Sequence, residues 1–279
     1  MSAISAAQWE SYDRDGFLKL GPTLSKAETG ALAAQIEDIM LGRLSYPGMM
    51  MQLDLGGAYD EMPEQTKSFK GARLDYRKIQ DLERDPLYLI FLNKAVFREA
   101  CSRVYPNAEG ISIYRAMFMN KPAGKGTELP WHQDGGENWN IAPDPLLTAW
   151  TALSPSTLES GAVQVVRGSH KLGLLSKKGH LISEQMAERH CSADKVVNLE
   201  AEAGESYLLH NFLIHRSGVN TTASPRMAFS VCYMDGLTRH KKYRTSYPTV
   251  FRNETLPKSG TEHLGTGTFF TPVPVPGAL

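Results

Sequence analysis

The chain has 279 residues, of which 42% are hydrophobic and 22% are charged, so it carries enough apolar side chains for a folded core. Thirty Lys and Arg residues balance thirty Asp and Glu residues, which argues against a surface that binds nucleic acid or an anionic membrane. The first residues carry no signal sequence, and no apolar run reaches the roughly eighteen residues that a membrane helix needs. We therefore expect a cytoplasmic protein that acts on a small molecule.

Residues 1–110 are predicted to be mainly helical. The first clear helix starts at the capping-box pair Ser25 and Glu28, after which apolar residues keep to one helical face. Residues 43–72 are rich in Gly, Pro and Met without a regular period, so we predict a loop region. A second helix is predicted over residues 85–104, because Asp-Pro is a typical N-cap and first-turn pair.

From residue 111 the sequence changes to short β-type runs separated by turn residues, among them ISIYRAMFMN, LLTAWTAL, AVQVVRG, KVVNL, ESYLLH, FLIH and RMAFSVCYM. This spacing predicts an antiparallel barrel or sandwich. We expect an α+β, mainly β fold in a single domain over residues 1–279, with helical support at 1–110, a β core at 111–236 and a C-terminal extension at 237–279. The end of that extension, FFTPVPVPGAL, is predicted to be an extended arm broken by prolines.

The stretch LPWHQDGG places His132 and Asp134 two positions apart. In a strand, residues i and i+2 point to the same face, so both side chains would point inward and Gln133 would point away. Such a pair suits two neighbouring ligands of one metal ion. An H-x-D sequence also arises by chance, so the pair alone leaves a surface loop as an alternative.

A third ligand is predicted at His215, which ends one β-type run while Arg226 begins the next. We expect these two residues side by side in an antiparallel hairpin. An arginine beside the metal is explained if the metal carries an anionic co-substrate, because a guanidinium binds a carboxylate bidentately. Two His and one carboxylate leave one face of an iron octahedron open, as in non-heme Fe(II) oxygenases. His210, five residues before His215, would point to the other face and is expected to be structural.

Taken together, these motifs resemble the phytanoyl-CoA dioxygenase family of Fe(II)- and 2-oxoglutarate-dependent oxygenases. The resemblance covers most of the chain and rests on RKIQDL, MNKPAG, LPWHQD, TAWTAL, SGAVQVVRGSH, AGESYLLHNFLIHRSGVN and SPRMAFSVCYM, in the family's order and spacing. It implies a double-stranded β-helix (jelly roll, cupin-like) core and, as cofactors, Fe(II), 2-oxoglutarate and O2. Arg167 departs from the family, which usually has proline in its P-G-S-H turn.

The resemblance also assigns roles to individual residues. His132, Asp134 and His215 match the iron triad, and Arg226 matches the arginine that pairs with the distal carboxylate of 2-oxoglutarate. Further co-substrate contacts are implied for three residues, Ser217, Trp150 and Lys78.

Four other residues are candidates for contact with the substrate, Glu137, Asn138, Trp139 and Arg73. For Trp139, packing within its loop is an equal alternative. Lys121, in MNKPAGKG, is expected to be a solvated loop residue rather than a ligand.

We therefore predict an oxygenase that hydroxylates or oxidatively cyclises a C–H bond of a small polar metabolite. The resemblance favours a sugar-containing specialised metabolite such as an orthosomycin antibiotic, with an amino acid or small phosphonate as the alternative. The carboxylate of Asp134 argues against halogenation, because related halogenases have a small residue at this position. A zinc-dependent hydrolase with the same triad is the alternative enzyme class, but it has no evident need for Arg226. An intact triad argues against a non-catalytic binding protein.

Overall fold

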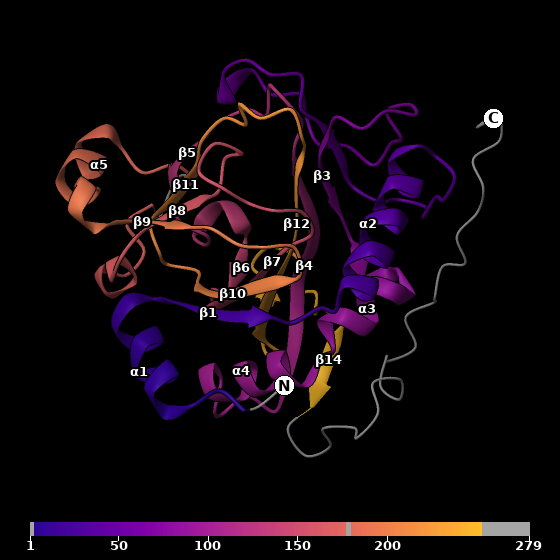
Figure 1. The fold of residues 1–279 in the computed structure, drawn as a ribbon. Coiled ribbons are helices and arrows are strands. Elements are labelled where there is room, and N and C mark those ends of the chain that lie inside the picture. The colour runs from indigo at the N-terminus through magenta and orange to yellow at the C-terminus, as the bar shows by residue number, and fades with distance from the viewer. Residues whose placement is uncertain (1–2, 177–179, 253–279) are drawn as a thin grey trace.

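The computed structural model describes residues 3–176 and 180–252, and β-strands make up its centre (Figure 1). The strands are β1 (Phe17–Pro22), β2 (Met51–Leu53), β3 (Tyr76–Gln80), β4 (Gly110–Lys121), β5 (Leu129–His132), β6 (Ile141–Ala142), β7 (Leu147–Ala152), β8 (Val163–Val166), β9 (Val196–Leu199), β10 (Glu205–His210), β11 (His215–Ser217), β12 (Arg226–Asp235), β13 (Arg239–His240) and β14 (Thr249–Arg252). The α-helices are α1 (Ala6–Asp15), α2 (Lys26–Met40), α3 (Pro86–Leu92), α4 (Ala95–Val104) and α5 (Glu184–His190).

These strands form two main antiparallel sheets. The larger sheet has the order β1-β10-β7-β12-β4-β3-β2, with β14 also paired to β4, and the smaller sheet has the order β5-β11-β8-β9. A separate short pair joins β13 and β6. The two sheets share one apolar cluster, to which β7 contributes Trp150 and Ala152 and β8 contributes Val163 and Val165. The sheets therefore face each other and enclose a common interior.

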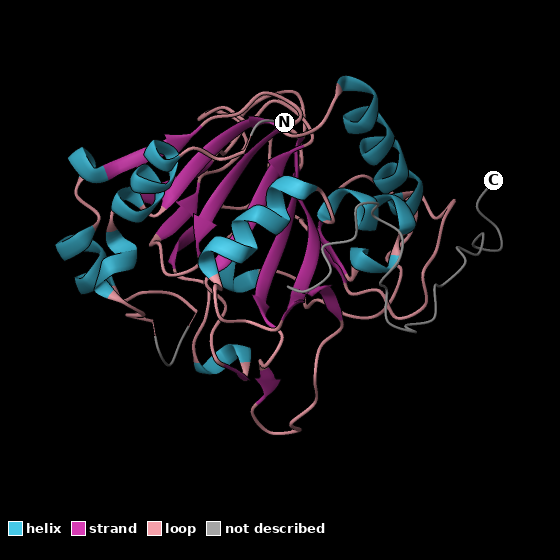
Figure 2. Cartoon of the chain, turned by 90° about the horizontal axis from the view of Figure 1, so that it is seen from below, coloured by secondary structure: helices cyan, strands magenta, loops and turns pink. Residues whose placement is uncertain are grey.

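Helices lie against the outer face of the larger sheet (Figure 2). The main apolar cluster joins helix residues such as Ile36 and Phe97 to strand residues such as Phe118, Phe229 and Tyr233. On β12 these outward residues alternate with residues that face the other sheet. One strand thus packs against the helices with one face and lines the interior with the other.

Local sequence explains where the helices begin. The capping box predicted at Ser25 and Glu28 is present at the start of α2, and the carboxylate of Asp85 accepts the first free N–H groups of α3. The single helix predicted over 85–104 is wrong, because the chain breaks between α3 and α4. Asn93 donates its side-chain amide to the Leu89 carbonyl, and Lys94 has an extended backbone with a ψ of 144°.

The N-terminal part contains more strand than the sequence predicts. β1 pairs with β10 and β3 pairs with β4, so segments before residue 110 extend the larger sheet. β2 interrupts the loop region predicted over 43–72. Such short strands are defined by their partners in the sheet and carry little periodic signal of their own.

The mainly β architecture with a helical layer confirms the predicted fold class. Among the described residues, no helix combines the length and the apolar character needed to cross a membrane. The arm predicted over residues 269–279 lies outside the described part of the chain.

Candidate metal centre and co-substrate pocket

His132 and His215 lie opposite each other on neighbouring strands of the smaller sheet. His132 ends β5, His215 begins β11, and the antiparallel register pairs them directly. Their ring centroids are 3.9 Å apart, and Nε2 of His215 lies 4.0 Å from Oδ2 of Asp134. One ligand atom from each of the three residues lies within 4.8 Å of the other two. The structure therefore brings the three predicted ligands together.

Backbone carbonyls fix the tautomer of both histidines. Nδ1 of His132 lies 2.8 Å from the Pro130 carbonyl oxygen, and Nδ1 of His215 lies 2.9 Å from that of Leu213. A carbonyl oxygen only accepts hydrogen bonds, so each Nδ1 carries the proton and each Nε2 keeps its lone pair. Burial lowers the pKa of His132 well below its usual range, which keeps this imidazole neutral as metal binding requires.

Asp134 is held in place from two sides. The prediction put it within a strand, but β5 ends at His132 and Asp134 lies in the bend that follows. Its backbone N–H donates to the Asn211 carbonyl at 2.9 Å. Nη2 of Arg115, on β4, donates to Oδ1 at 3.2 Å, while Oδ2 faces His215. The carboxylate thus has one oxygen bound by an arginine and the other directed toward the imidazoles.

Gln133, between the two ligands, is fully buried and points away from them. Its amide nitrogen donates to the carbonyls of Gly173 and Phe212, and its oxygen accepts from the N–H groups of Leu175 and Ser176. The side chain uses both ends of its amide to join the metal motif to two loops. This arrangement agrees with the predicted alternation of side chains.

The donor set suits one transition metal ion. Two imidazoles and a carboxylate occupy three neighbouring positions of an octahedron and leave room for other ligands. A structural zinc site would supply a fourth protein ligand. Within residues 3–176 and 180–252, His132, Asp134 and His215 form the only group of three or more His, Cys, Asp or Glu side chains close enough to share an ion.

Arg226 approaches this group from the other sheet. β11 belongs to the smaller sheet and β12 to the larger, so the predicted hairpin between His215 and Arg226 is wrong. The loop over residues 218–225 crosses between the sheets instead of turning back within one, and Thr221 anchors it by donating to the Glu159 carbonyl. His215 and Arg226 nevertheless line the same cavity.

Arg226 and Trp150 are buried with unused hydrogen-bond donors. Nη2 of Arg226 donates to the Gly161 carbonyl at 3.0 Å, whereas its Nε and Nη1 have no partner among the described residues. The indole Nε1 of Trp150 also has none. Burial lowers the pKa of Arg226 to about 10, so the group remains a cation at neutral pH. Such orphaned donors indicate a missing acceptor, and an acceptor that matches a guanidinium is a carboxylate.

Ser217 and Lys78 line the same cavity. Ser217 ends β11, and Lys78 of β3 pairs with Met119 of β4. Burial, with Arg77 and Arg115 nearby, lowers the pKa of Lys78 to about 7. The structure thus places all four residues expected to contact the co-substrate around the cavity that the triad lines, and the donor set fits a dicarboxylate such as 2-oxoglutarate.

The wall of the cavity is apolar between these polar groups, with Met117, Met119, Leu129, Val163 and Leu209.

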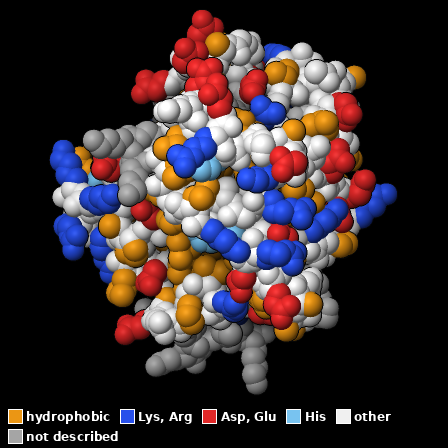
Figure 3. Space-filling model, turned by 90° about the vertical axis from the view of Figure 1, so that its left-hand side faces the viewer, with side chains coloured by type: hydrophobic (Ala, Val, Ile, Leu, Met, Phe, Trp, Pro, Cys, Tyr) orange, Lys and Arg blue, Asp and Glu red, His pale blue; other side chains and the backbone are white. Residues whose placement is uncertain are grey.

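The molecular face that carries α5 shows histidine side chains together with interspersed basic and acidic side chains (Figure 3). Charges of both signs on this face agree with a net charge of zero.

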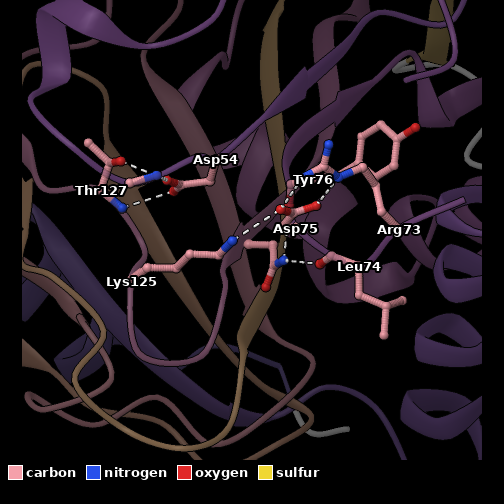
Figure 4. A network of polar contacts seen from close by, with 9 residues as sticks. Asp54, Arg73, Leu74, Asp75, Tyr76, Lys125 and Thr127 are labelled. Atoms are coloured by element: carbon pink, nitrogen blue, oxygen red, sulfur yellow. Dashed lines mark hydrogen bonds and ion pairs between the residues drawn. The ribbon is translucent and has the colours of Figure 1, made fainter. Parts of the chain in front are cut away.

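The four residues proposed for substrate contact do not line this cavity. Trp139 is buried, with its ring stacked on Tyr114 at 4.6 Å between centroids, and Glu137 and Asn138 share its 3-10 turn. Arg73 pairs with Asp75, which also binds Lys125 (Figure 4). The contacts of Trp139 therefore match the alternative that it packs within its loop.

Lys121 is not a solvated loop residue, so that prediction is wrong. It ends β4 with only 4% of its surface exposed, and its Nζ donates to the Thr127 carbonyl at 2.6 Å. The glycines around it made the segment resemble a surface turn, although period-two counting from Arg115 places Lys121 on the inner face.

Arg115 and His180 also line the cavity and were not predicted. Arg115 binds Asp134, and its guanidinium carbon lies 4.4 Å from the Trp139 ring centroid. The His180 ring lies beside that of His132, with 4.5 Å between ring centroids. The alternation along β4 could have revealed Arg115, whereas His180 lies in a loop that no local pattern connects to the site.

Comparison with known proteins agrees with this geometry. The sequence model of the family described as phytanoyl-CoA dioxygenase (PhyH) matches residues 12–228. A probable phytanoyl-CoA dioxygenase of Caenorhabditis elegans is 27% identical over 257 residues, which cover 86% of this chain and 78% of the relative. The 1-deoxypentalenic acid 11-beta-hydroxylase of Streptomyces exfoliatus is 28% identical over 236 residues, which cover 77% and 74% of the two chains.

Solved structures share the fold. The non-heme alpha ketoglutarate dependent carbocyclase SnoK from nogalamycin biosynthesis superposes with a TM-score of 0.64 at 20% identity, covering 85% of this chain and 87% of SnoK. This similarity confirms the predicted jelly-roll core.

Proposed function

Because this chain belongs to the phytanoyl-CoA dioxygenase family of Fe(II)- and 2-oxoglutarate-dependent oxygenases, we propose that the cavity between its sheets is the active site. The observation that carries this proposal is the convergence of two groups on one cavity. The triad presents ligand atoms for one metal ion, and the buried donors of Arg226 and Trp150 lack an acceptor. An iron-bound dicarboxylate would satisfy both groups.

In this proposal His132, Asp134 and His215 hold Fe(II). When bound, the iron with 2-oxoglutarate and O2 supplies the oxidising power that breaks a substrate C–H bond. The protein contributes orientation, because carbonyl bonds to both Nδ1 atoms aim the Nε2 lone pairs and Arg115 aims the Asp134 carboxylate.

Arg226, Trp150, Ser217 and Lys78 bind 2-oxoglutarate in this proposal. The guanidinium pairs with the distal carboxylate, so the keto acid end extends toward the triad on the opposite sheet. The apolar side chains of Met119, Leu129 and Val163 exclude water between these two ends.

The substrate is proposed to be a small polar metabolite that is hydroxylated or oxidatively cyclised, with a sugar-containing specialised metabolite as the first candidate. Support comes from polar groups in the cavity, including Arg115, Thr148 and Ser230. Two similar proteins are a hydroxylase named for 1-deoxypentalenic acid and a carbocyclase from nogalamycin biosynthesis. We also propose that the chain is one domain, since β1 to β3 and β14 join the sheet formed by the core strands.

The test is 2-oxoglutarate turnover by anaerobically prepared protein given Fe(II) and then O2, followed as succinate. We expect uncoupled succinate formation by the wild type and none by His215→Ala. A parallel titration with 2-oxoglutarate, followed by the visible absorption of its Fe(II) complex, covers the case of tight coupling to an absent substrate. A wild type without either signal would disprove the proposal. A positive result would be extended by a mass-spectrometric screen of glycosidic metabolites.

A further inference from the structure

Lys121 and Arg226 are direct partners across the β4–β12 ladder. Side chains of paired residues lie on the same face of a sheet, here the face toward the cavities. Both are almost fully buried, with 4% and 2% of their surfaces exposed. The larger sheet therefore carries two basic side chains next to each other in the protein interior.

Such a pair is unfavourable in its doubly charged form unless an anion accompanies it. Like charges directly opposite each other destabilise a sheet, and burial adds the loss of hydration. Burial, followed by the charges of Arg226 and Arg77, lowers the pKa of Lys121 to about 6. The acidic groups that act on Lys121 are Asp54 and Glu128. Asp54 lies 4.0 Å from Arg77, so its charge is shared with a third buried cation.

The surroundings of Lys121 are shaped to hold a lysine. A Cβ atom added to Gly126 would lie 2.6 Å from the Lys121 Cβ, and one added to Gly161 would lie 2.6 Å from its Cδ. The Lys121 Nζ donates to the Thr127 carbonyl. Asp54 in turn accepts from the N–H and the hydroxyl of Thr127 (Figure 4). The side chain therefore follows a path between two glycines to a fixed acceptor.

An anion has a place beside this pair. Lys121 and Arg226 line a small inner cavity together with Asp54 and Arg77. This cavity shares Lys78, Leu129 and Ser217 with the cavity of the triad. Nε and Nη1 of Arg226 remain without a partner among the described residues. A ligand that extends from the triad to Arg226 would bring its far end next to Lys121.

We infer that Lys121 is the second cation of the pocket for the distal carboxylate of 2-oxoglutarate, so that a cross-strand Arg–Lys pair binds this end. The inference rests on the proposed function and adds a residue to it. Lys121 contributes its charge to the carboxylate while its bond to Thr127 holds the side chain in position.

The test compares two ligands that differ in the distal carboxylate alone, 2-oxoglutarate and 2-oxovalerate. Both are titrated anaerobically into the Fe(II)-loaded full chain, and dissociation constants are taken from the visible absorption of the complexes. Lys121→Met removes the charge and keeps most of the volume. Lys125→Met is the matched control, because Lys125 lies in the same segment as Lys121 and its exposed side chain pairs with Asp75 instead.

We expect Lys121→Met to weaken 2-oxoglutarate by about tenfold or more and to change 2-oxovalerate by less than about twofold. Lys125→Met should change neither, and Lys121→Arg should retain most of the preference for the dicarboxylate. An unchanged preference in Lys121→Met, with or without a lower melting temperature, would overturn the inference and leave a structural lysine. A wild type that binds 2-oxoglutarate no better than 2-oxovalerate, with Lys121→Met unchanged, would likewise overturn it.

Calorimetry provides a second readout that does not depend on affinity. Binding of the dianion should cause proton uptake at neutral pH by the wild type and less by Lys121→Met, because the carboxylate restores the charged form of Lys121, whereas Lys78 contributes equally in both. Comparing buffers with different ionisation enthalpies measures this uptake. Equal uptake with 2-oxovalerate would overturn the inference. A wild type that binds neither ligand in the presence of Fe(II) would disprove the proposed function itself.

Discussion

His132 and His215 are cross-strand partners, and each donates its Nδ1 proton to the carbonyl two residues before it. The same local device on two strands fixes both Nε2 atoms toward a common point. The imidazoles are therefore oriented by the backbone before any metal binds.

Replacing one of these histidines should abolish metal binding. We expect His215→Ala to weaken Co(II) binding by more than about a hundredfold, because one of three ligands is lost. The measurement is a titration followed by the d–d absorption of Co(II). His210→Ala is the control, since the His210 ring lies beside that of His170 and does not line the cavity. Equal losses in the two variants would contradict the assigned triad.

Arg115 should act on the metal through Asp134. Arg115→Gln is expected to weaken Co(II) binding by about tenfold to a hundredfold, because the carboxylate loses the group that orients it. Arg216→Gln is a matched control in the same cavity, since Arg216 binds Gln164 and lies over the Trp131 ring. Unchanged affinity in Arg115→Gln would show that Asp134 needs no such support.

The indole N–H of Trp150 should contribute to co-substrate binding without contributing to folding. Trp150→Phe removes a donor that has no partner among the described residues, so any loss of stability should come from the smaller ring in the core and not from a lost hydrogen bond. We expect the dissociation constant of 2-oxoglutarate to rise by about threefold to tenfold, the value of one hydrogen bond. A large loss of stability with unchanged affinity would assign Trp150 to the core alone.

Gln133 should be a stability residue despite its place between two metal ligands. Gln133→Leu leaves several buried backbone groups unpaired, so urea unfolding should show a loss of about 2–4 kcal/mol. Gln164→Leu, which removes an exposed contact with Asn198 and a partly buried one with Arg216, should cost less, about 1 kcal/mol. Similar costs for the two variants would contradict this assignment.

Glu83 should make stability depend on pH. Burial, followed by the nearby Asp81, raises the pKa of Glu83 from 4.5 to about 7. Between pH 4.5 and about 7, Glu83 is protonated in the folded chain and ionised in the unfolded chain. The stability that the protonated Glu83 contributes is therefore complete below about pH 4.5 and is lost as pH rises through about 7. Glu83→Gln removes the effect. Urea unfolding at about pH 5 and about pH 8 should show the wild type losing more stability with rising pH than the variant.

Much of the site followed from local periodicity. The i, i+2 spacing brought His132 and Asp134 to one side even though β5 ends between them, because Gln133 is bound on the opposite side. The same rule applied from Arg115 along β4 would have found Lys121. The glycines near Lys121 outweighed that signal, although in the structure they make room for its side chain.

What local patterns could not provide is the assignment of strands to sheets. His215 and Arg226 were expected in one hairpin because a turn-rich segment separates them. The loop between them instead crosses from the smaller sheet to the larger, which depends on contacts such as that of Thr221 with Glu159. Pairing partners far apart in sequence, including β1 with β10, are determined by the packing of the whole chain.

The two histidine ligands lie on the smaller sheet, whereas Arg226 and Lys121 lie on the larger one. In the proposed site, the separation of the sheets would set the distance between the iron and the carboxylate pocket, and with it the chain length of the 2-oxo acid that fits. The apolar residues packed between the sheets, such as Val163 and Val165, act as spacers for this distance. The proposed site therefore predicts that selectivity for a five-carbon dicarboxylate over its shorter and longer homologues depends on the packing of the core, at positions that touch neither end of the ligand.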